Sequence, residues 1–400
     1  MLLAAYLDRI GHAIVSKSGH EVAAFISLAS VHVQVELESL SLEQIDQICR
    51  SKLARLETFG DIICNIVKAR KHLTNQQTIE AYECEIAALV KLMGIFREES
   101  NWVLSFLHVL ILDTRLIASS ADQQAARKAG EEIHDNLRNA EQHLKKMFAM
   151  AANDRAPLEQ SKKLGSLHIV DQLFKIYFKL NTIHLCRNLI RAVEGPAFPA
   201  FERFSRADKV TYQYYVGRIS MFEDQYHKAE KCLDYAWEHC HKSHVRNKRM
   251  ILQFLVPVKL LLGIMPSPQL MSSYALDEYN GLTEAIRCGD LRSFNTYLER
   301  YQDKYIQQGV FLLIEKLRLV VFRNLLKKVY LIRQSHQLRF SDLQLACSFV
   351  TDEAMDMNEL ECILANLIFK GYIKGYMSHQ KKILVVSKAQ PFPPITTVSN

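Results

Sequence analysis

Residues 356–386 decide the fold, and they read DMNELECILANLIFKGYIKGYMSHQKKILVV. Asp356 with Glu359 is a capping pattern that begins a helix, and Gly371 is placed to stop it. After the glycine, residues 372–376 and 383–386 predict two strands joined by a polar turn. The helix has one apolar stripe, formed by Leu360, Ile363, Leu364, Leu367 and Ile368.

Two more helices are predicted upstream of this stretch. Ser341 with Gln344 is a capping-box pattern that begins the nearer one. The farther one has an apolar face made by Leu313, Leu317, Val321, Leu325, Val329 and Ile332. Three helices followed by a hairpin is the order of a winged helix, a variant of helix-turn-helix. We therefore expect a winged helix at 313–388 and a proline-containing extended tail at 389–400.

The rest of the 400-residue chain predicts packed helices. The first proline is Pro157, and the preceding sequence is rich in Ala, Leu, Glu, Gln and Lys. A partial tetratricopeptide signature occurs later, at Val216, Gly217, Tyr226, Ala229, Leu233 and Ala236. We therefore expect an all-α solenoid, with N-terminal helical repeats at 1–200 and a tetratricopeptide-like subdomain at 201–312.

Positive charge is concentrated near the C-terminus. Seven cations and no acid lie between Lys316 and Arg339, and five cations and no acid lie in residues 370–388. This separation predicts a basic edge suited to a phosphate backbone or to an acidic partner, although a solvated helix edge is the simpler alternative. The candidate RNA- or DNA-binding residues are Lys316, Arg323 and Lys327 on one predicted helix face, and Lys374, Lys381 and Lys382 on or beside the wing.

A second basic cluster lies in an acid-free stretch at 239–276. Its members are Lys242, Arg246, Lys248 and Arg249. The cluster could receive an acidic partner or add to an RNA path, and it could equally be a polar turn between helices.

No motif predicts catalysis. The sequence has no phosphate-binding glycine loop, nucleophile elbow or His-Glu-x-x-His pattern. The run of His and Cys at 239–244 lacks the second ligand pair that zinc requires. We therefore expect neither an enzyme nor a metal or other cofactor. Nine cysteines without a Cys-x-x-Cys pair favour a reducing compartment. The apolar runs near 102–112 and 254–265 are expected to be too short to span a bilayer.

A solenoid that ends in a winged helix resembles the PCI-domain fold of the proteasome lid, the COP9 signalosome and translation initiation scaffolds. Local sequence narrows the resemblance to the PCI domain-containing protein 2 family. The similar stretches are 171–178, 211–218, 247–252, 330–338, 362–368 and 384–394. The resemblance covers roughly residue 95 to the end of the chain.

This resemblance implies a non-catalytic subunit of the nuclear transcription-and-export complex, which couples transcription to mRNA export. The implied partners are a Sac/GANP-type scaffold, itself a PCI protein, and a small acidic Sem/DSS-type protein. The two winged helices would lie side by side and form a composite basic surface for RNA or DNA. The implied location is the nucleus, associated with the nuclear pore, with a cytoplasmic pool allowed. The alternative is a pure assembly subunit of a proteasome-lid-like or COP9-signalosome-like complex without a nucleic-acid role.

Overall fold

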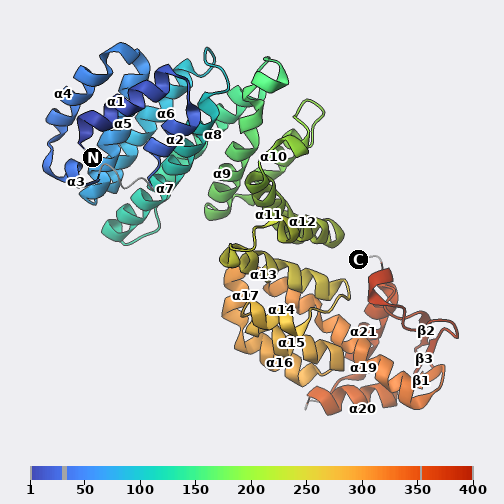
Figure 1. Ribbon diagram of the computed structural model, residues 1–400. Coiled ribbons are helices and arrows are strands. Elements are labelled where there is room, and N and C mark those ends of the chain that lie inside the picture. Colours follow the sequence, from blue (N-terminus) through green and yellow to red (C-terminus); the bar gives the residue numbers. More distant parts are fainter. Residues whose placement is uncertain (1, 29–33, 352–353, 399–400) are drawn as a thin grey trace. The chain divides into compact units, whose positions relative to one another are not determined.

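The computed structural model describes residues 2–28, 34–351 and 354–398, which form two compact units at 1–212 and 213–400 (Figure 1). The helices of the first unit are α1 (Leu3–Val15), α2 (Gly19–Ile26), α3 (Gln34–Ser39), α4 (Leu42–Leu53), α5 (Glu57–Thr74), α6 (Thr78–Ile95), α7 (Val103–Ala129), α8 (Asp135–Ala152), α9 (Ser166–Lys179) and α10 (Cys186–Val193). The division between the units falls within α11 (Arg206–Phe222).

α7 is the central helix of the first unit, where it packs against α2, α6, α8 and α9. It continues for 27 residues and is long and apolar enough to cross a membrane by length and composition, so the apolar run at 102–112 is part of a longer segment than we expected. Half of its most apolar window is buried inside the unit. Its buried Asp122 accepts bonds from the Asn136 and Leu137 amides at 2.9 and 3.0 Å, and so satisfies the first turn of α8.

The second unit begins with helical hairpins. Its helices before the winged helix are α12 (Tyr226–His239), α13 (Val245–Leu261), α14 (Pro268–Ser273), α15 (Asp277–Cys288), α16 (Leu291–Arg300) and α17 (Gln302–Gln308). The tetratricopeptide signature fits the packing of α12, because Ala229, Leu233 and Ala236 are buried. A Cβ on Gly217 of α11 would lie 2.7 Å from Leu233 Cγ, so only glycine permits this close approach.

The C-terminal elements form the expected winged helix. They are α18 (Phe311–Lys316), α19 (Arg318–Arg333), β1 (Gln337–Arg339), α20 (Phe340–Thr351), α21 (Met357–Phe369), β2 (Gly375–Ser378) and β3 (Ile383–Val386). The strands make one antiparallel sheet in the order β1-β3-β2. The prediction of an all-α solenoid that ends in a winged helix is confirmed.

Three local details differ from the sequence prediction. The helix expected to run through residue 317 is two helices, because the Leu317 amide bonds to Ile314 three residues back and tightens the turn. β1 was not predicted. α20 begins at Phe340, and the Gln344 side chain donates to the Met355 carbonyl at 2.7 Å instead of closing a capping box with Ser341. Asp356 does cap α21, by accepting a bond from the Asn358 amide.

The tail returns to the winged helix. The Pro391 carbonyl accepts a bond from the Lys374 amide at 2.9 Å, and the chain then reaches a 3₁₀ turn, η7 (Ile395–Thr397). Phe392, Ile395 and Val398 are buried. The expected extended tail is therefore bent, with a positive φ of 49° at Gln390, and it completes the apolar core of the second unit.

Candidate nucleic-acid and partner interface

The winged helix exposes large apolar side chains on α19, α20, α21 and β2. Leu345 and Phe349 lie one turn apart on α20 and are 72% and 80% exposed. The others are Leu331, Ile332, Phe369 and Tyr376. Exposed apolar side chains that form a contiguous patch mark interaction sites, and the pair on α20 is a candidate for one. Ile332 was expected on the apolar face of its helix but is 80% exposed. The other five were not predicted, although Leu345 and Phe349 do not lie on the buried face of α20, which contains Leu343 and Cys347.

Several of the predicted phosphate-binding cations are also exposed. Lys327 is on α19, Lys374 precedes β2 and Lys381 is in the turn between β2 and β3. None of the three has a side-chain ion pair in the part of the chain that the structure describes. Their ammonium groups can therefore reach a phosphate backbone without first leaving a carboxylate.

Lys382 differs from its neighbour Lys381. Its Nζ lies 2.6 Å from Glu361 Oε1, and His379 Nδ1 lies 2.6 Å from the other oxygen of the same carboxylate. Bonds from Lys382 and then from His379 hold the pKa of Glu361 below its ordinary value. This cluster ties the wing to α21, and a partly exposed pair of this kind at the surface contributes little stability. Lys382 is thus partly neutralised.

Lys316 is also paired. Its Nζ lies 2.6 Å from Asp224 Oδ1 and 2.8 Å from the Tyr226 hydroxyl. The pKa of Asp224 is lowered by the Lys316 bond and then by Tyr226. These residues line a groove of about 660 Å³ together with the partly exposed Phe222 and Leu312. Lys316 therefore belongs to a mixed polar and apolar groove.

The placement of Arg323 on an exposed basic stripe was wrong. Its side chain is buried, with 5% exposure, and its guanidinium donates to the Phe392 and Pro393 carbonyls at 3.2 and 2.6 Å. Helical periodicity could not reveal this because the covering residues belong to the tail, about seventy positions away. Burial lowers the pKa of the guanidinium. Arg323 anchors the tail.

The second basic cluster also contains both exposed and buried side chains. Lys242 and Arg246 are exposed. Lys248 is buried, donates to the Trp237 carbonyl at 2.9 Å, and holds its ammonium 4.0 Å from the centre of the Trp237 ring. Arg249 donates to the Ala275 carbonyl at 3.0 Å. Lys248 and Arg249 are therefore packing residues, and only Lys242 and Arg246 present their charges to an acidic partner or an RNA.

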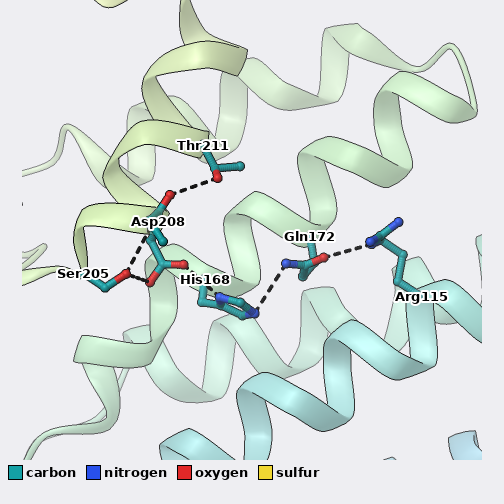
Figure 2. Close-up of polar contacts among 7 residues, drawn as sticks. Arg115, His168, Gln172, Ser205, Asp208 and Thr211 are labelled. Carbon is teal, nitrogen blue, oxygen red and sulfur yellow. Dashed lines mark hydrogen bonds and ion pairs between the residues drawn. The ribbon is translucent and has the colours of Figure 1, made fainter. Parts of the chain in front are cut away.

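The first unit contains a Ser, His and Asp cluster that could be mistaken for a catalytic triad (Figure 2). Asp208 accepts bonds from Ser205 Oγ at 2.7 Å and contacts His168 Nδ1 at 2.8 Å. The serine thus faces the carboxylate, whereas a serine nucleophile must face the imidazole. Gln172 lies between His168 and Arg115, and bonds to Arg115 Nε at 2.8 Å.

This cluster is a structural connection between α7, α9 and the beginning of α11. The Asp208 amide donates back to Ser205 Oγ, which caps α11. Among the residues described by the structure, no three His, Cys, Asp or Glu side chains are arranged to hold a metal ion. The geometry of the Ser205, His168 and Asp208 cluster therefore supplies neither a nucleophile paired with a base nor a metal centre.

Comparison with known proteins identifies two matching families. Residues 296–388 match the PCI domain, and residues 128–282 match PSMD3-like N-terminal TPR repeats. PCI domain-containing protein 2 of Xenopus laevis is 40% identical over 397 residues, which is 98% of each chain. The Danio rerio protein of the same name is 38% identical with the same coverage. Protein CSN12 homolog of Gibberella zeae is 31% identical over 73% of this chain and 72% of its own. The similarity thus extends well upstream of residue 95.

Proposed function

The chain belongs to the PCI domain-containing protein 2 family, and from that premise we propose that it is a nucleic-acid-binding scaffold subunit of a nuclear mRNA-export complex. Membership of a PCI family supports the role of a complex subunit, and such scaffolds are generally non-catalytic. One observation carries the proposal furthest: the winged helix has both an exposed apolar surface and exposed lysines.

The apolar residues of α20 are the proposed contact with a Sac/GANP-type PCI scaffold. Phe349 and Leu345 would be buried against the partner's winged helix, and burying each would contribute about 1.5–3 kcal/mol. We expect Leu345→Asp with Phe349→Asp to abolish co-purification with the scaffold while the circular dichroism spectrum is unchanged. Val90→Asp is the matched control, because Val90 is an exposed apolar residue on α6 of the first unit.

The exposed lysines are the proposed phosphate contacts. Lys327, Lys374 and Lys381 can follow a backbone, whereas Asp356 and Glu359 at the beginning of α21 would repel phosphate. In many helix-turn-helix proteins this helix reads the bases. We therefore propose binding that is independent of sequence and strongly dependent on salt. The exposed Lys242 and Arg246 are a proposed second path for RNA or a contact for the small acidic Sem/DSS-type protein.

The proposed location is the nucleus, at the nuclear pore, which the chain would reach as part of the complex.

The test of RNA binding uses the complex of this chain with the scaffold's PCI region and the acidic protein. An unstructured RNA is titrated at several salt concentrations against wild type and against Lys374→Glu with Lys381→Glu. We expect weaker binding and a salt slope shallower by about 0.7 for each lysine removed. Lys17→Glu with Lys128→Glu, two exposed lysines of the first unit, is the control for the change in net charge.

The other outcomes separate the alternatives. If the wing variant binds like wild type, the RNA path lies on the partner or on Lys242 and Arg246. If the wild-type complex does not bind RNA, the proposal fails, and the chain is a pure assembly subunit of a proteasome-lid-like or COP9-signalosome-like complex.

A further inference from the structure

Two cysteines meet where α4 packs against α5 in the first unit. Cys49 of α4 is buried, with 2% exposure, and Cys64 of α5 is half-buried. The Cys64 thiol donates to Asp46 Oδ1 at 3.2 Å, and Cys49 lies one turn after Asp46 on α4. Lys68 Nζ lies 2.6 Å from the same Asp46 oxygen. An ammonium, a carboxylate and the Cys64 thiol are therefore in contact, and Cys49 lines the same cavity as these three side chains.

This cavity gives small molecules access to the four side chains. It has a volume of about 440 Å³ and is lined by Asp46, Cys49, Cys64 and Lys68, with Lys91 nearby. Lys91 is paired with Asp61, which also lines the cavity. Cys49 is thus shielded from most of the solvent but adjoins a space far larger than a peroxide molecule.

The two thiols have different acidities. The neighbouring Cys64 lowers the pKa of the Cys49 thiol, against burial and the Asp46 carboxylate, which both raise it, and the Lys68 ammonium adds to the lowering. The neighbouring Cys49, burial and the bond to Asp46 raise the pKa of the Cys64 thiol. A thiolate is the reactive form of cysteine, and a nearby thiol that retains its proton can resolve an oxidised partner. The pair therefore has the asymmetry of a nucleophilic cysteine and a resolving cysteine.

We propose that Cys49 and Cys64 are a site of reversible oxidation, at which hydrogen peroxide converts the dithiol into a disulfide that joins α4 to α5. In the first step the Cys49 sulfur attacks a peroxide oxygen. An S–O bond forms, the O–O bond breaks, and the released hydroxide takes the proton that the Cys49 thiol has given up and leaves as water. In the second step the Cys64 sulfur attacks the Cys49 sulfur. The S–S bond forms, the S–O bond breaks, and the hydroxyl leaves with the Cys64 proton as water. The two cysteines lose two electrons and the peroxide gains them.

Other cysteines of the chain provide internal comparisons. Cys84 is half-buried near Lys68, but burial raises the pKa of its thiol. Cys288 bonds to Glu284 within its own helix, and this bond raises the pKa of its thiol. Cys362 is exposed on α21. Exposure alone would make Cys362 the first cysteine to oxidise, whereas the arrangement at Cys49 and Cys64 predicts that this pair reacts first.

The test treats the full chain with a limiting amount of hydrogen peroxide. Remaining thiols are alkylated, and proteolytic peptides are analysed by mass spectrometry without reduction. We expect a cross-linked peptide pair containing Cys49 and Cys64, lighter by two hydrogens than the two free peptides, which forms before Cys362 is modified. Dithiothreitol should restore both thiols. In Cys64→Ser the disulfide cannot form, so Cys49 should accumulate as a sulfenic acid that dimedone traps.

Two results would overturn the proposal. One is that Cys49 and Cys64 stay fully alkylatable while Cys362 oxidises. The other is that Cys49 oxidises but never forms a bond to Cys64. The first measurement uses the wild-type chain, so it does not depend on the folding of a variant. Cys362→Ser is the control for oxidation at the surface, and the outcome is independent of whether the chain binds RNA.

Discussion

Replacing Arg323 by alanine should destabilise the second unit without acting through RNA. The guanidinium is buried on α19 and donates to the carbonyls of Phe392 and Pro393. Alanine removes both bonds and leaves the two carbonyls without that donor beneath the tail. The ring of Phe392 also lies 5.9 Å from the guanidinium carbon and loses this contact.

The expected loss of unfolding free energy follows from the two hydrogen bonds of Arg323 that alanine removes. A hydrogen bond to a charged group contributes about 1.5–3 kcal/mol, so losing two should cost about 3 kcal/mol even if the tail relaxes. For a unit of this size, 1 kcal/mol corresponds to about 2–4 °C in melting temperature, which gives a decrease of about 6–12 °C. Arg323→Lys should lose less, because one ammonium can still reach a carbonyl but cannot reproduce the planar fork.

The assay follows the second unit by the fluorescence of Trp237 in a Trp102→Phe background, where Trp237 is the only tryptophan. Urea and thermal unfolding are compared with Lys327→Ala, an exposed residue one turn along the same helix, which should change stability by less than about 0.5 kcal/mol. If Arg323→Ala is as stable as this control but weakens RNA binding, the assignment of Arg323 to the tail is refuted. In that case the original placement on a phosphate-binding face would stand.

Three further predictions concern single side chains. Lys248→Ala should cost about 2 kcal/mol of unfolding free energy and shift the indole fluorescence, whereas Lys242→Ala should do neither. Burial and a neighbouring carboxylate raise the pKa of Glu85 to about 8. The folded chain therefore keeps a proton that the unfolded chain has released, and the stability of the first unit should fall as pH rises from about 5 to 8, by at most about 1.4 kcal/mol per pH unit. Urea titrations of Glu85→Gln should show a smaller fall, limited to the lower pH values at which Asp113, whose pKa burial raises to about 6, still titrates. Gly217→Ala should cost about 1–3 kcal/mol through steric overlap in the same unfolding assay. Gly94→Ala, where a Cβ meets nothing within 4 Å, should be neutral or stabilising when unfolding of the first unit is followed by the fluorescence of Trp102.

The winged helix could be predicted because its signals are local. Asp356 caps α21 and Gly371 ends that segment with a φ of +73°, so each boundary is encoded within a few residues of its position. β1 has no such signal. It is three residues long and exists because it pairs with β3, about forty-five positions later, as in the Leu338 to Leu384 pair. A contact this distant in sequence leaves no periodicity within the strand itself.

The candidate site was less predictable for a related reason. A helical wheel places Arg323 and Lys327 near each other, but it cannot show that the tail covers the first and not the second. Likewise Lys248 and Lys242 look equivalent as basic residues, and only the position of Trp237 distinguishes them. Phosphate binding by the exposed lysines stays a prediction.

The returning tail also has a consequence for the nascent chain. Residues 389–398 are synthesised after every helix and strand that they cover, yet Phe392, Ile395 and Val398 belong to the core of the second unit. Until they emerge from the ribosome, Arg323 has no carbonyl partners from the tail and the apolar surface of α19 beneath Phe392 is open to water. Partly folded chains with such surface are prone to aggregate. The second unit thus reaches its native core only at the end of translation of this segment, when the first unit has long been available to fold.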